Sequence, residues 1–162
     1  MQVLLCFIFI FSYFVQSAAA LEVDSAEVVL PSSLGYTSET WEQINFGTTF
    51  SSPPIVITTP GPSSGGQPFT IRIRNVTTTG FEAMTAEPAG NSGPTHLSVE
   101  MTYIAIEEGI HGLPDGSMII AGKSDVFEEQ LIGTAGSWYS ELFSVPFQST
   151  PSILAQIQTM NN

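Results

Sequence analysis

The chain has 162 residues and a net charge of −12, and its only basic residues are Arg72, Arg74 and Lys123. Binding to nucleic acid or to an anionic membrane surface requires clustered Lys and Arg, so this charge balance excludes both. A hydrophobic content of 43% indicates a folded chain, and this length holds one domain or two small ones.

The first segment in chain order, 1–20, reads "MQVLLCFIFIFSYFVQSAAA". Its apolar run over 3–15, followed by small residues, predicts a secretory signal peptide cleaved after Ala20. The run is shorter than the about 20 apolar residues of a membrane span, and an uncleaved anchor is the alternative. We therefore expect a secreted, extracellular protein with no membrane insertion after cleavage. The sole cysteine, Cys6, lies in this segment, so the mature chain has no disulfide.

Beyond residue 20 the sequence predicts an antiparallel all-β domain. Short β-branched and aromatic runs alternate with clusters of Gly, Pro and Ser, and helical periodicity is almost absent. Alternating apolar and polar residues indicate half-buried strands, which pack as a sandwich. The expected strands are 25–30, 42–50, 54–59, 68–76, 79–86, 97–107 and 117–121.

Gly, Pro and Ser mark the connections between these strands. The segments 59–68 and 87–96 are predicted to be exposed loops, and 112–117 a turn. Between the strands 68–76 and 79–86 we expect a tight connection in which Gly80 adopts a positive φ.

A repeat with an offset of 97 residues extends from the first half of the chain to its end. It begins upstream of Trp41, where Leu34 and Thr37 recur as Leu131 and Thr134. One domain length separates the copies, which predicts a tandem repeat. We expect a complete domain over 21–123 and the truncated start of a second over 124–162, in a fragment of a longer tandem protein. The alternative is that 138–158 pairs with the first copy or with another chain. The main identities join Trp41, Phe46, Phe50, Ser52 and Pro54 to Trp138, Phe143, Phe147, Ser149 and Pro151.

The stretches "INFGTTFSSPPIVI", "IRIRNVTTTGFEA" and "MTYIAIEEG" resemble an H-type lectin domain, the family of the snail agglutinins that bind N-acetylgalactosamine. The resemblance covers about 42–109 of this sequence. It implies a six-stranded antiparallel β-sandwich, assembly into trimers or hexamers, and sugar binding between protomers without a metal or other cofactor. The matching positions are Ile44, Phe46, Phe50, Pro53, Pro54, Arg72, Thr79, Gly80, Phe81, Tyr103, Ile104, Ile106 and Glu107.

The candidate sugar-binding residues lie mainly in the two longest loops. The family's sugar-binding Arg falls at Gln67 or Pro68 here, and its His falls near Ala89, with His96 close by. Planar polar side chains bond sugar hydroxyls in pairs. Ordinary solvated loop polarity is the alternative for all of them. The candidates are Gln67, Arg72, Glu87, Asn91 and His96, with Thr95 beside them.

Two other features have structural explanations that compete with a binding role. Arg72 and Arg74 are expected to pair across strands with Glu82 and Glu100, and this is favoured over ligand contact. Asn75 begins the sequon Asn-Val-Thr at a strand end, which predicts N-glycosylation of a secreted chain.

Catalytic and metal motifs are absent from the sequence. It has no Gly-x-Ser-x-Gly, no His-Glu-x-x-His and no phosphate-binding loop. His111 is interpreted as a turn residue, and no zinc ligand set is expected. The acidic stretches near 107–116 and 123–130 leave a calcium site open, although neither has EF-hand spacing.

These observations favour a secreted, non-catalytic carbohydrate-binding or cell-adhesion module whose partners are glycans or glycoproteins. Linked modules gain strength from high effective concentration, which suits a tandem chain. The alternatives are a structural spacer domain of a larger extracellular protein, or an accessory domain of an enzyme not contained in this chain. The sequence does not specify which sugar is bound.

Overall fold

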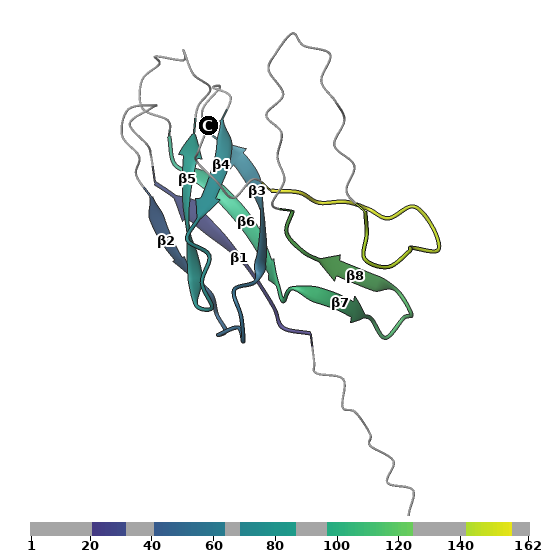
Figure 1. Ribbon diagram of the computed structural model, residues 1–162. Coiled ribbons are helices and arrows are strands. Elements are labelled where there is room, and N and C mark those ends of the chain that lie inside the picture. The colour runs from purple at the N-terminus through teal and green to yellow at the C-terminus, as the bar shows by residue number, and fades with distance from the viewer. Residues whose placement is uncertain (1–20, 32–40, 64–68, 87–96, 125–141, 157–162) are drawn as a thin grey trace, which may run out of the picture.

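The computed structural model describes residues 21–31, 41–63, 69–86, 97–124 and 142–156 (Figure 1). Every regular element in these ranges is a β-strand, so the predicted all-β class is confirmed. The predicted signal peptide, 1–20, lies outside the described residues. The strands are β1 (Val23–Leu30), β2 (Glu42–Asn45), β3 (Ile55–Ser63), β4 (Thr70–Arg74), β5 (Gly80–Ala86), β6 (Val99–Ile106), β7 (Gly109–Gly112) and β8 (Met118–Ala121).

The strands form three antiparallel sheets. One sheet has the order β1-β6-β3 and a second has the order β2-β5-β4. β7 and β8 pair with each other as a separate hairpin, which lies to one side of the two larger sheets in Figure 1. The expected strands at 25–30, 54–59, 68–76, 79–86, 97–107 and 117–121 all correspond to strands of the structure.

The two three-stranded sheets share one hydrophobic core, which makes the arrangement sandwich-like. The rings of Phe81 on β5 and Tyr103 on β6 meet edge to face, with centroids 5.2 Å apart. On β4, Ile71 and Ile73 are buried as the predicted alternation requires. The buried cluster consists of Leu30, Ile44, Phe46, Phe50, Val56, Ile71, Ile73, Phe81, Ala83, Met101, Tyr103 and Ala105.

One buried hydroxyl in this core is satisfied by a carboxylate at the sheet edge. Tyr103 donates its phenolic hydrogen to Oδ2 of Asp24 on β1 at 2.7 Å. Burial, and then this hydrogen bond, raise the pKa of Tyr103 well above its ordinary value. The tyrosine therefore stays neutral and serves as a structural link between β6 and β1.

The expected strand 42–50 ends earlier, at Asn45. Beyond it the backbone leaves the ladder and follows the β4–β5 connection, where Phe46 N donates to Thr79 O and Phe50 N donates to Thr78 O, both at 2.9 Å. The bend is also held by Asp24, whose Oδ2 accepts a hydrogen bond from Gly47 N at 3.1 Å. This path brings both phenylalanines into the core, with ring centroids 5.2 Å apart.

Gly80 is required, but the predicted reason is wrong. The positive φ in the β4–β5 connection belongs to Asn75, at 49°, while the glycines with positive φ among the described residues are Gly109 and Gly116. A Cβ on Gly80 would instead collide with the carbonyl oxygen of Ile44 on the neighbouring strand. Close approach of two backbones therefore explains the glycine.

The predicted loop 59–68 is wrong over its first half, because β3 continues to Ser63. Its pairing with β6 shifts register between Pro60 and Ser63. A proline tolerates this place because β3 is an edge strand, on which some N–H groups need no ladder partner. Residues 64–68 lie outside the described residues.

The predicted turn at 112–117 is confirmed as the link between β7 and β8. Leu113 N donates to Ser117 O at 2.8 Å, and Gly116 has a φ of 83°. The interpretation of His111 as a turn residue is wrong, because it lies in β7 opposite Ile119. Its Nε2 donates to the carbonyl of Glu107 at 2.8 Å.

The second occurrence of the aromatic motif shares two local features with the first. Chain bends at 47–48 and 51–52 recur at 144–145 and 148–149. Phe143 and Phe147 pack edge to face at 5.0 Å, like Phe46 and Phe50. However, Phe143 is 47% exposed, and no strand forms within the described segment 142–156.

Candidate functional site

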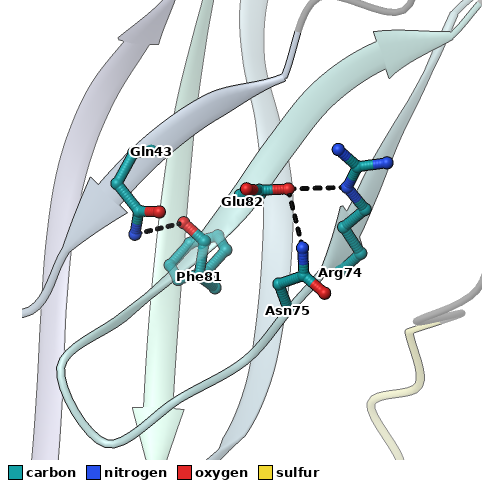
Figure 2. A network of polar contacts seen from close by, with 5 residues as sticks. All are labelled: Gln43, Arg74, Asn75, Phe81 and Glu82. Carbon is teal, nitrogen blue, oxygen red and sulfur yellow. Dashed lines mark hydrogen bonds and ion pairs between the residues drawn. The ribbon is translucent and has the colours of Figure 1, made fainter.

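A row of polar side chains crosses the outer face of the β2-β5-β4 sheet. In the ladder register, Gln43 on β2 lies opposite Glu82 on β5, and Glu82 lies opposite Arg74 on β4. Glu82 points outward because its neighbours Phe81 and Ala83 are fully buried in the core. Three adjacent strands thus place an amide, a carboxylate and a guanidinium side by side (Figure 2).

Glu82 is the centre of this row. Its Oε2 accepts a hydrogen bond from Arg74 Nε at 2.6 Å and another from Asn75 Nδ2 at 3.0 Å. These bonds outweigh the opposing effect of desolvation, so Arg74 first and Asn75 second lower the pKa of Glu82. The carboxylate is therefore charged at neutral pH.

At one end of the row, Gln43 is anchored to the backbone. Its Nε2 donates to the carbonyls of Phe81 and Ile44, both at 3.2 Å. These bonds orient the amide along the sheet (Figure 2). The row is thus held in place from both sides, and it presents a fixed pattern of donors and acceptors.

An aromatic ring completes this face. Trp41 directly precedes β2, and its ring lies under the guanidinium of Arg74, with Cζ 4.0 Å from the ring centroid. This is cation–π geometry, in which the planar guanidinium stacks on the indole. We call Trp41, Gln43, Arg74, Asn75 and Glu82 the tryptophan face.

The sequence indicated only parts of this face. It placed Arg74 on the outer side of its strand and predicted its pairing with Glu82, which the ion pair confirms. The pairing with Glu100 is wrong, because Glu100 lies on β6 in the other sheet, opposite Val29. For Trp41 the sequence pattern indicates only that the residue is repeated at Trp138. Its place directly before an alternating strand was the signal that could have found it.

Most of the predicted sugar-binding residues cannot be compared with the tryptophan face. Gln67, Glu87, Asn91, His96 and Thr95 lie outside the described residues. Arg72 lies on β4, two residues before Arg74 and on the same outward side, opposite Met84. The structure therefore brings one of the five, Arg72, next to the tryptophan face.

The sequon residue Asn75 lies at the edge of this face. It is exposed, and it follows β4 directly in the left-handed conformation. The sequon hydroxyl, Thr77 Oγ1, donates to the carbonyl of Gly80 at 3.0 Å. Asn75 Nδ2, the atom to which a glycan would be attached, is the atom that donates a hydrogen bond to Glu82.

Two classes of site have no counterpart in the described part of the chain. No group of three or more His, Cys, Asp or Glu side chains there is arranged to hold a metal ion. Asp115, in the stretch considered for calcium, instead accepts hydrogen bonds from Ser117 N and Oγ at 2.9 and 2.6 Å. Within the same ranges, no helix has the length and apolar character to span a membrane.

Comparison with known proteins gives no match to a protein-family model or to a curated protein. A functional interpretation therefore depends on the chemistry of the tryptophan face and on the sequence pattern.

Proposed function

We propose that this chain is a secreted, non-catalytic carbohydrate-binding module of the H-type lectin kind, and that the tryptophan face contacts the sugar. The observation that carries this proposal is the stack of Arg74 on Trp41, 4.0 Å from ring centroid to Cζ, next to the Glu82 carboxylate. Sugars bind where an aromatic surface lies beside planar polar groups that bond adjacent hydroxyls.

The polar groups of this face suit a pair of neighbouring hydroxyls. Both hydrogen bonds to Glu82 use Oε2, and the side chain is 26% exposed. Its Oε1 would accept from one hydroxyl, while the side-chain oxygen of Gln43 or Asn75 would accept from a second. Because the row is fixed by its own hydrogen bonds, little side-chain entropy is lost on binding.

The fold is compatible with the family resemblance. Several aromatic residues of the quoted stretches are core residues, namely Phe46, Phe50, Phe81 and Tyr103. Two three-stranded sheets around that core support a six-stranded sandwich. We propose that the hairpin β7–β8 is an extra element outside this six-stranded sandwich.

The tandem organisation is also part of the proposal. The recurring bends and the edge-to-face ring pair support a second copy that begins in the same way as the first. Linked copies would raise the avidity of individually weak sugar sites. Assembly into trimers or larger species follows from the resemblance and predicts a correspondingly large species on sizing.

Retention on immobilised glycans tests the binding proposal. The chain produced in a host that does not glycosylate Asn75 should bind at least one class of glycan. Trp41→Ala should reduce that binding by roughly two- to tenfold, since loss of an aromatic contact removes about 0.5–1.5 kcal/mol. Lys123→Ala is the control, because Lys123 follows β8 and lies outside the tryptophan face. Equal losses in both variants would contradict the assigned face.

The second candidate is a structural spacer with no ligand of its own. The specific observation in its favour is that the polar groups of the face already bond one another: Arg74 and Asn75 bond Glu82, and Gln43 bonds the backbone. A spacer would give a well-folded chain that binds no glycan, with Trp41→Ala affecting stability alone.

A further inference from the structure

The described segment 142–156 contacts the strands of the two larger sheets through Gln156. Gln156 lies between β3 and β4, which are edge strands of different sheets. Its Oε1 accepts hydrogen bonds from Thr58 Oγ1 at 2.9 Å and from Thr58 N at 3.3 Å. Its Nε2 donates to the carbonyl of Ile71 at 3.0 Å. One amide thus joins the two sheets.

The chemistry of this contact suits a primary amide. Thr58 presents donors from one sheet, while Ile71 presents an acceptor from the other, and a planar amide accepts from the first and donates to the second. Both Thr58 and Ile71 are buried. Backbone N–H and C=O groups on edge strands destabilise the fold when they are buried without a hydrogen-bond partner. The Gln156 amide therefore stabilises the seam between β3 and β4.

The glutamine is not part of the repeated pattern. With the offset of 97 residues, Gln156 corresponds to Thr59, which is exposed on β3. Two of the repeated positions, Phe46 and Phe50, are core positions in the first copy. In the second copy Ile153 and Leu154 remain 69% and 73% exposed. Polar contact therefore holds this segment, rather than burial of its apolar side chains.

We propose that the seam between β3 and β4 is a docking site for residues 151–156 of the same chain, with Gln156 as its anchor. The second motif then performs a different task from the first. The first motif contributes to the core, whereas the segment that follows the second motif, through Gln156, joins the edges of the two sheets. In Figure 1 the yellow segment ends beside β3, in line with this contact.

Amide hydrogen exchange at Thr58, measured by NMR on the secreted full chain, tests the proposal. Gln156→Ala should accelerate exchange of the Thr58 amide by about fivefold, the effect of losing a hydrogen bond of about 1 kcal/mol. Gln148→Ala, which lies in the described range 142–156 but outside the docked residues and is exposed, should leave it unchanged. Equal rates in the wild type and Gln156→Ala would overturn the proposal.

Two isosteric substitutions keep the test informative if Gln156→Ala perturbs the fold. Gln156→Glu keeps the acceptor for Thr58 but loses the donor for Ile71, so it should give an intermediate exchange rate. Thr58→Val should release the 151–156 segment, seen as faster exchange of its amides, whereas Thr59→Val should not. If Thr59→Val has the same effect, the anchor is not Gln156.

The occupant is tested by dilution. Docking within one chain predicts that the Thr58 exchange rate is independent of protein concentration. A rate that rises on dilution would show that a second copy supplies the glutamine, and it would overturn docking within the chain.

Discussion

Arg74 stacks on Trp41 with its guanidinium carbon 4.0 Å from the ring centroid, while its Nε donates to Glu82 at 2.6 Å. The same guanidinium therefore has an aromatic partner and an anionic partner. One contact joins β4 to its neighbour β5, and the other joins β4 to the residue that precedes β2, on the far side of β5. The arrangement fixes the flat surface on which the proposed sugar site depends.

Arg74→Lys should weaken this arrangement although it conserves the charge. A lysine ammonium lacks the plane that stacks on indole and the fork that meets the carboxylate. We expect a loss of about 0.5–1.5 kcal/mol in the free energy of unfolding, measured by chemical denaturation. Lys123→Ala is the control, because its ion pair with Glu108 is long, at 3.5 Å, and about half exposed. A loss in the control as large as in Arg74→Lys would contradict the argument.

The lowered pKa of Glu82 predicts an acid-sensitive contribution to stability. The folded-state pKa lies below the ordinary value of 4.5, so the unfolded chain binds the proton more readily. The contribution is therefore present above pH 4.5 and is lost as the pH falls through the folded-state pKa. Denaturation of the wild type and of Glu82→Gln across pH 2–7 should show the difference between them shrinking on acidification. A difference independent of pH would contradict this.

The two phenylalanine pairs should differ strongly in their contribution to stability. Phe50 is 2% exposed in the core, so Phe50→Ala should cost about 3–5 kcal/mol of unfolding free energy. Its repeat equivalent, Phe147, contacts Phe143, which is 47% exposed. Phe147→Ala should therefore cost less than about 1.5 kcal/mol. Similar costs by thermal or chemical denaturation would show that the second motif has a buried core of its own.

Glycosylation of Asn75 should be visible as an increase in mass when the chain is secreted from a glycosylating host. The side chain is exposed and follows the end of β4. Asn75→Gln and Thr77→Ala should both abolish the increase, because each destroys the sequon. Persistence of the glycan in both variants would assign it to another residue. The attached sugar would also replace one of the two hydrogens on Asn75 Nδ2, the nitrogen that bonds Glu82. It would cover part of the tryptophan face.

Local pattern predicted the strands well, because alternation of residues such as Ile71 and Ile73 is set by the strand itself. Local pattern did not predict which strands belong to the same sheet. Glu100 was paired with the wrong sheet because β6 lies between β1 and β3, a choice that no local pattern encodes. Gly80 was identified for the wrong reason because its constraint comes from Ile44, on a strand distant in sequence.

The candidate site was harder still to predict. Trp41 and Arg74 meet only because β2 and β4 flank the same strand, β5. Likewise, nothing in the motif around Phe147 indicates that Gln156 reaches Thr58. Side chains that come together across strands are placed by the fold. The candidates in the loops were chosen from composition alone, which does not predict which residues meet.

An NMR titration of the ¹⁵N-labelled mature chain, produced without glycosylation of Asn75, with a glycan that it retains tests the central claim most directly. The side-chain amide signals of Gln43 and Asn75 should shift on saturation, together with the Trp41 indole signal, while the Gln156 amide stays in place. Shifts confined to the amides of Gln67 and Asn91, with the tryptophan face unmoved, would contradict the account.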